Sequence, residues 1–322
     1  MRRLLLLTLS ILLLGLTVAL VGGAFVRARA VTLHARMPEN GGWSLDTLEA
    51  SAGQPLRLHL VSDDVLHGFA IGQSETPEIV LYPGKTVETT LTFDQPGTYT
   101  YYCTRWCGPN HWRMRGTIVV TGDSPGVGNT LPEPPLYVTL GLDIDAPHRA
   151  ETLPSAGMPS AERGQAVLDN LPQRVRTLAW YRTHSPAAAW QELRAYPSLA
   201  SLSDAALWDA VAALWQQAAV PNLDEAARIY AQQCAACHGT RGKGDGPFAQ
   251  SPSPHGLSDV TAPPDFGDPA FALGASPALW QGKILRGGMG TGMPSWGVIF
   301  TEAQTWALTD YLWTFSLLSP PR

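Results

Sequence analysis

Two short cysteine-containing segments hold the residue types best able to do chemistry. The first reads Cys103-Thr-Arg-Trp-Cys107-Gly-Pro-Asn-His111-Trp-Arg-Met114, and a distant histidine stands in Asp-Val-Leu-His67-Gly-Phe. Thiolate, thioether and imidazole groups all suit copper. A mononuclear blue-copper site needs only one cysteine, and here a second follows four residues later. Two thiolates can bridge two copper ions, with one histidine on each ion. Met114 would then be a weak ligand of one ion, and a backbone carbonyl could serve the other.

The second segment is Cys234-Ala-Ala-Cys237-His238. This C-x-x-C-H pattern is typical of c-type haem attachment, in which both thiols bond to the porphyrin and the histidine binds the iron. The alternatives are a Cys103–Cys107 disulfide for the first segment, and a redox disulfide or part of a zinc site for the second. If both metal motifs are correct, they use all four cysteines.

Residues 31–121 have the pattern of β-structure, which must position the first segment. Short apolar or alternating runs are separated by turn signals such as Tyr-Pro-Gly and Gln-Pro-Gly. Several short strands in a stretch of this length predict an all-β sandwich or barrel. The runs are Val31–Arg36, Pro55–Val61, Glu78–Tyr82, Thr86–Phe93, Thr98–Cys103 and Gly116–Thr121.

The rest of the chain has a helical pattern after a Gly/Pro-rich linker predicted at 122–159. Amphipathic runs occur at Ala205–Trp215, Leu223–Cys234 and Glu302–Leu317. Residues 160–222 contain neither cysteine nor methionine, yet Leu202–Trp215 aligns with Phe300–Trp313, with both tryptophan pairs at matching offsets. Two hypotheses remain for 160–222: a degenerate cytochrome repeat without haem, or a helical spacer.

The N-terminal stretch determines the predicted compartment. Leu4–Val26 contains no charged residue and is long enough to cross a bilayer as a helix. We therefore predict a membrane anchor in residues 1–30, with a cleaved signal peptide as the alternative. Either the anchor or the signal peptide would export the residues after 30 across the membrane. The net charge of −5 argues against nucleic acid as a partner, and the 45% hydrophobic content excludes a disordered chain.

Residues 50–121 resemble the CuA domain of cytochrome c oxidase subunit II, especially the one-helix form of B-type oxygen reductases. The resemblance rests on the histidine motif, the C-x3-C-x3-H-x2-M loop and the Gly-Thr-Ile-Val-Val strand that follows it. It implies a cupredoxin-like sandwich over 31–121 that holds a dinuclear copper centre. The implied ligands are His67, Cys103, the backbone carbonyl of Arg105, Cys107, His111 and Met114.

Residues 223–318 resemble a small class I cytochrome c, in which a methionine before a proline is the sixth iron ligand. This implies an all-α domain with one covalent haem c, bound by Cys234 and Cys237 and ligated by His238 and Met293. Met289 is the second candidate for the sixth ligand. The expected fold is thus multidomain: a transmembrane helix, a β-sandwich and an α-helical cytochrome c domain.

The resemblance implies a redox subunit that is not itself catalytic. As subunit II of a respiratory haem-copper oxidase, it would pass electrons from an external donor through haem c and CuA to subunit I, which reduces oxygen. A soluble cytochrome c or a quinol-oxidising complex would be the donor. The chain would cross the bacterial plasma membrane once, with both centres on the periplasmic side. Alternatives are the equivalent subunit of a nitric oxide reductase, a periplasmic copper carrier and a soluble electron shuttle.

Overall fold

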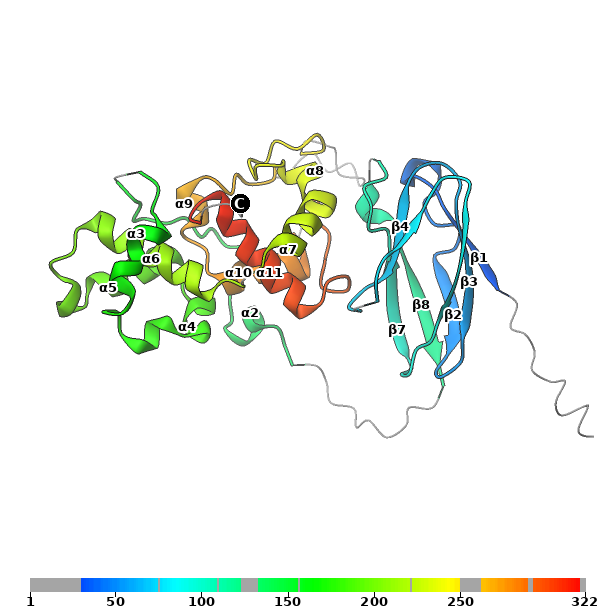
Figure 1. The fold of residues 1–322 in the computed structure, drawn as a ribbon, viewed down its shortest axis with the longest axis horizontal. Helices are drawn as coiled ribbons and strands as arrows, with labels where there is room; N and C mark the ends of the chain where they lie inside the picture. Colours follow the sequence, from blue (N-terminus) through cyan, green and yellow to red (C-terminus); the bar gives the residue numbers. More distant parts are fainter. Residues whose placement is uncertain are drawn as a thin grey trace, which may run out of the picture.

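The computed structural model describes most of the chain after the predicted anchor. The described residues are 30–74, 76–108, 110–122, 133–155, 157–220, 222–249, 262–288 and 292–318. A β-sandwich lies beside a helical region, and the helices of 223–318 lie between the sandwich and the helices of 160–222 (Figure 1). The predicted anchor at Leu4–Val26 falls outside the described residues. Within these residues, no helix has the length and hydropathy needed to cross a membrane.

The sandwich consists of a three-stranded sheet and a five-stranded sheet. The first has the order β1 (Val31–Ala35), β3 (Leu56–Ser62), β6 (Thr86–Leu91). The second has the order β2 (Thr47–Ser51), β8 (Arg115–Thr121), β7 (Gly97–Tyr102), β4 (His67–Ile71), β5 (Ile79–Leu81). Alternating inward side chains of both sheets form the core between them. The all-β prediction for this part of the chain is confirmed.

Strands β2 and β4 were not among the predicted runs. All five residues of β4 are buried. The strand pairs with β5 on one side and with β7 on the other. A strand that is covered on both faces has no polar/apolar alternation, so the periodicity that revealed the other strands is missing.

The helices of 223–318 form around the second cysteine segment. Helix α7 (Asp224–Ile229) continues through a π-helical turn, Tyr230–Cys234, into α8 (Ala235–His238). The later helices are α9 (Pro269–Ala272), α10 (Pro277–Arg286) and α11 (Glu302–Leu312). Helix α11 begins with a complete capping box between Thr301 and Gln304. The amphipathic runs predicted here are therefore helical.

The described residues of 133–155, 157–220 and 222 share one hydrophobic core with the cytochrome-like helices. The helices are α2 (Leu136–Thr139), α3 (Ala161–Leu168), α4 (Leu178–Thr183), α5 (Pro186–Arg194) and α6 (Asp204–Ala218). The Trp215 and Trp313 rings pack edge to face, with their centroids 6.0 Å apart. From the predicted linker, Ile144 is buried in this core, and the Ala150 N–H donates to the Ala270 carbonyl at 2.7 Å. These residues are part of the helical body.

Helices α6 and α11 share their capping pattern and buried tryptophans, in keeping with the alignment of their sequences. Ser203 and Thr301 cap the two helices through their side chains. The aligned tryptophans are buried in both segments, with Trp313 in the turn that follows α11. Helices α5 and α10 also both start with a capping serine followed by proline. The haem-less repeat remains a prediction, which these matched features support.

Gly164 allows α3 and α6 to cross closely. A Cβ at this position would lie 1.9 Å from the Asp209 carbonyl oxygen. We expect Gly164→Val to destabilise the helical region by about 3 kcal/mol, because the two backbones must move apart. Chemical denaturation, monitored through the circular dichroism signal of the helices, measures the loss of stability. Gln165→Val, at an exposed position of the same helix, is the matched control and costs under about 1 kcal/mol.

The buried carboxylate of Asp310 links the helices of 160–222 to those of 223–318. The Tyr181 hydroxyl donates to Asp310 at 2.6 Å, and the Val220 N–H donates to it at 3.0 Å. Burial raises the pKa of Asp310 although both hydrogen bonds oppose the shift. We expect Tyr181→Phe to cost about 1–3 kcal/mol at neutral pH.

The cost of Tyr181→Phe should shrink below about pH 4, where Asp310 is protonated in both the folded and the unfolded chain. Without the Tyr181 hydrogen bond, the folded-state pKa of Asp310 rises further. The stability of the variant therefore falls more steeply than that of the parent chain as pH rises. Denaturation curves between pH 3 and 7 measure the difference. A cost that does not change with pH would contradict this role of the hydroxyl.

Candidate metal and haem centres

The first cysteine segment is the loop between two paired strands. It begins after β7 ends at Tyr102, and β8 starts directly after Met114. The Cys103 N–H donates to the Met114 carbonyl at 2.9 Å, which closes the base of the loop. His67 is the first residue of β4, the neighbour of β7 in the same sheet. The strand order therefore brings the distant histidine to the loop.

The predicted copper-binding side chains converge in the interior of the sandwich end. Nδ1 of His67 lies 3.7 Å from Sγ of Cys103, and Nδ1 of His111 lies 3.3 Å from Sγ of Cys107. Sδ of Met114 is 3.3 Å from the Cys107 sulfur. Ligand atoms of His67, Cys103 and Cys107 all lie within 4.8 Å of one another. All five side chains are buried.

Arg105 contributes its backbone to the same cluster. Its carbonyl oxygen lies 3.3 Å from the Cys103 sulfur. Its guanidinium turns away to an ion pair with Glu78, which also accepts a hydrogen bond from Thr104. The side-chain ion pair thus holds the peptide that presents the carbonyl inward.

Both imidazoles are oriented through the nitrogen that faces away from the sulfurs. Nε2 of His67 lies 2.8 Å from Asp64, and Nε2 of His111 lies 3.1 Å from Oε1 of Gln233. Burial would raise the pKa of Asp64, but hydrogen bonds from His67 and the Met37 and Val65 N–H groups lower it well below its usual range. An ionised Asp64 accepts a hydrogen bond from Nε2–H of His67, which leaves Nδ1 unprotonated and able to bind a metal ion.

The chemistry of the thiol pair fits a bound cation. Burial would raise the pKa of Cys103, but hydrogen bonds from Cys107, His111 and His67 lower it well below its usual range. The hydrogen bond to Cys103, together with burial, raises the pKa of Cys107. The pair therefore releases one proton easily and holds the second, because two thiolates repel each other in a buried site. Metal ions remove this repulsion. Both cysteines are free thiols, so the disulfide alternative is wrong for this structure.

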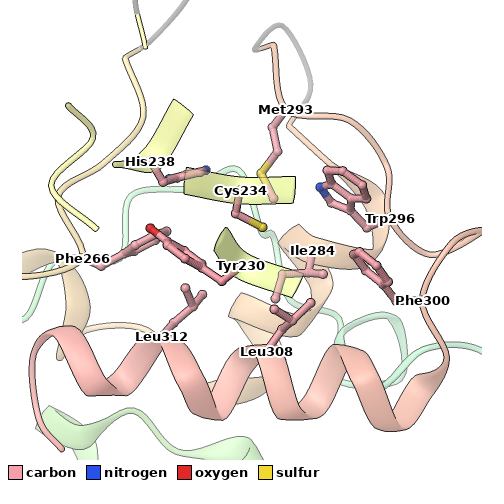
Figure 2. A pocket seen from close by; sticks show the side chains of 10 residues that line it. All are labelled: Tyr230, Cys234, His238, Phe266, Ile284, Met293, Trp296, Phe300, Leu308 and Leu312. Carbon is pink, nitrogen blue, oxygen red and sulfur yellow. The ribbon is translucent and has the colours of Figure 1, made fainter. Parts of the chain in front are cut away.

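The second cysteine segment borders a small, partly open cavity. Figure 2 shows Cys234, His238 and Met293 directed at this cavity among apolar and aromatic side chains. The other lining residues are Tyr230, Phe266, Ile284, Trp296, Phe300, Leu308 and Leu312. Cys237 is a free thiol on the same turn but is not part of the lining. Met289 lies outside the described residues.

The residues around the cavity fit a haem. Nδ1 of His238 is buried and has no hydrogen-bond partner within the described part of the chain. Burial lowers the pKa of His238 to about 4, so at neutral pH the imidazole has the uncharged form that binds iron. Burial also raises the pKa of Cys234 to about 12, which keeps its thiol protonated.

The two candidate sites lie next to each other across the domain contact. Gln233 hydrogen-bonds His111 and immediately precedes Cys234. The Trp106 ring lies 5.5 Å from that of Phe248, whose N–H donates to the Ala236 carbonyl. Sequence reasoning did not identify Gln233 or Asp64. Asp64, three residues before His67, could have been found as a local partner, whereas Gln233 carries no motif.

A cupredoxin-like sandwich beside a cytochrome-like helical domain defines an electron-transfer protein. Residues 47–122 match the family model "Cytochrome C oxidase subunit II, periplasmic domain", and residues 223–316 match the family model "Cytochrome c". The chain therefore joins a cytochrome c oxidase subunit II domain to a cytochrome c domain, which imply copper and haem respectively.

Individual relatives match a smaller part of the chain. Cytochrome c oxidase subunit 2 of Thermus thermophilus is 33% identical over 79 residues, which are 24% of this chain and 58% of the relative. The match thus spans little more than half of that relative. Nitrous-oxide reductase of Cupriavidus necator is 29% identical over 30% of this chain and 16% of its own length. The periplasmic domain of cytochrome oxidase subunit II of Bradyrhizobium japonicum has a TM-score of 0.24 at 20% identity, covering 29% of this chain and 85% of that chain.

Proposed function

We propose that this chain is the electron-transfer subunit II of a respiratory haem-copper oxidase. It would carry electrons from an external donor to the membrane subunit I, where oxygen is reduced. One observation carries the proposal: the loop of buried thiols and imidazoles is hydrogen-bonded to the residue that precedes the haem-attachment cysteine. A chain that passes electrons from one centre to another must hold the two close together, since the cofactors carry the redox chemistry and the protein supplies their orientation.

The loop residues would hold a dinuclear copper centre. Cys103 and Cys107 would supply the bridging thiolates, and His67 and His111 would each present Nδ1 to one ion. Met114 and the Arg105 carbonyl, which lie close to the two sulfurs, would be the remaining, weaker ligands. The surrounding strands exclude water from these groups, and Asp64 and Gln233 fix the two imidazoles.

The helical cavity would hold one haem c. Cys234 and Cys237 would bond it covalently, with His238 and Met293 as axial ligands. The apolar lining would keep water from the iron, and a thioether ligand favours the reduced form. When bound, the copper pair and the haem supply the one-electron redox chemistry, and the chain supplies their spacing and potentials.

Both domains would stand on the periplasmic side of a bacterial plasma membrane, anchored by a single span in residues 1–30. The oxygen-reducing subunit I would be the electron acceptor, and a soluble cytochrome c or a quinol-oxidising complex the donor. Similarity to the periplasmic domain of subunit II supports this location.

Purification of the chain from native membranes tests the proposal. We expect it to co-purify with a large haem-bearing membrane subunit, in a complex that consumes oxygen when the haem c is reduced. Consumption of nitric oxide instead would assign the chain to a nitric oxide reductase. Recovery as a soluble protein without such a subunit would contradict the proposal and favour an electron shuttle. Loss of copper to a chelator within seconds, with the fold intact, would favour a copper carrier.

A further inference from the structure

The cytochrome domain contributes a side chain to the wall of the candidate copper site. Oε1 of Gln233 lies 3.1 Å from Nε2 of His111, although 122 residues separate them in the sequence. His111 is only 1% exposed, so this nitrogen has no free access to water. His67 obtains its equivalent partner, Asp64, from within the sandwich. The two histidines therefore differ in which domain orients them.

The orientation of the Gln233 amide is fixed by its other contacts. Its Nε2 donates to the Cys103 carbonyl at 3.3 Å and to the Thr104 carbonyl at 3.4 Å. Carbonyl oxygens can only accept, so the NH₂ group must face them and Oε1 must face His111. Oε1 can only accept as well, so Nε2 of His111 must carry the proton. Nδ1 is then left unprotonated and faces the Cys107 sulfur at 3.3 Å.

Contacts outside the loop keep the two domains in this arrangement. The Arg115 side chain donates to the Ser295 carbonyl at 2.8 Å and stacks over the Trp296 ring at 4.7 Å. The Gln73 N–H donates to the Ile299 carbonyl at 2.8 Å. At the neighbouring Gly72, a Cβ would lie 2.3 Å from the Val298 carbonyl oxygen. Helices α7 and α8 lie on the side of the helical region nearest the sandwich (Figure 1).

We propose that Gln233 is a positioning residue for His111, so that the copper site is complete only when the cytochrome domain is docked against the sandwich. The inference rests on the proposed copper site. It goes further in giving one histidine an orienting partner from the haem-binding segment, directly beside Cys234. The docked cytochrome domain thereby sets the geometry of the copper site as well as facing it.

The test compares Gln233→Ala with Gln232→Ala in the full-length, copper-loaded chain. Gln232 is the adjacent residue of the same π-helical turn and takes no part in these hydrogen bonds. Loss of an outer partner typically lowers metal affinity by about 10- to 100-fold. We expect a drop of this size in copper affinity for Gln233→Ala, measured by chelator competition, and none for Gln232→Ala. The haem absorption spectrum should be unchanged in both.

Proton exchange identifies the histidine that is affected. We expect NMR of the copper-loaded chain to give a slowly exchanging Nε2 proton for each histidine. Gln233→Ala should speed exchange of the His111 proton roughly tenfold, the net worth of one hydrogen bond, without changing that of His67. Asp64→Ala should speed exchange of the His67 proton without changing that of the His111 proton. This readout does not depend on electron-transfer activity.

Gly72→Val is a second test, in which the docking of the domains is disturbed while Gln233 is unchanged. The added side chain should force the domains apart at the far side of the contact, which small-angle scattering detects as an increase in radius. The His111 proton should then exchange as fast as in Gln233→Ala. Normal copper affinity and normal exchange in Gln233→Ala would overturn the inference, as would a separated Gly72→Val chain with a slow His111 proton. If the parent chain binds no copper at all, the proposed function itself fails.

Discussion

Replacing Cys107 with serine is expected to abolish the dinuclear copper signal and leave the haem intact. The Cys107 sulfur contacts both His111 and Met114, so the substitution removes the atom around which that half of the site is arranged. A serine hydroxyl is a hard and weakly acidic donor that cannot replace a bridging thiolate between soft copper ions. The mixed-valence EPR spectrum should vanish, and copper content should fall from two ions per chain to one or none.

Arg113→Ala is the matched control for the cysteine variant. Arg113 belongs to the same loop but is exposed, and its side chain makes none of the site contacts described above. It should keep the copper spectrum of the parent chain. The haem spectrum should be identical in all three proteins, because Cys234 and Cys237 lie in the other domain. A normal dinuclear EPR spectrum in Cys107→Ser would contradict the assignment of the site.

Replacing Met293 with histidine is expected to lower the haem potential by on the order of a few hundred millivolts. Axial ligands set haem potentials over a range of about 0.8 V, and a thioether favours the reduced iron more than a second imidazole does. Haem attachment should persist, because Cys234, Cys237 and His238 are unchanged. Spectroelectrochemical titration of the purified chain measures the shift.

Met158→His is the control for the potential. Met158 is 64% exposed and is not among the residues that line the cavity, so the same substitution there should not move the potential. An unchanged potential in Met293→His would assign the sixth ligand to Met289 or to another residue.

The sequence was sufficient to predict those parts of the site that are local. The predicted copper loop and the predicted haem-attachment turn are continuous segments, so their spacing alone indicates the chemistry. Amphipathic periodicity likewise located α6, α7 and α11. Strand β4 could not be found this way, because its burial on both faces removes the alternation that reveals a strand.

Contacts between distant segments could not be predicted. Gln233 is one polar residue on a helix, and only the docking of the two domains brings it to His111. Ile144 stands in a stretch rich in glycine and proline, a composition that predicts a linker rather than part of a core. Its burial depends on the surfaces of helices that come later in the chain.

The continuous core beneath the haem cavity limits how the protein can be divided. Trp215 and Trp313 are both fully buried, and the Tyr181 hydroxyl is bonded to Asp310 across the same boundary. Cutting the chain at residue 222 would therefore expose large aromatic surfaces on both fragments. Residues 133–318 should melt in a single cooperative transition, and an excised 223–318 fragment should aggregate instead of behaving as a small independent haem carrier.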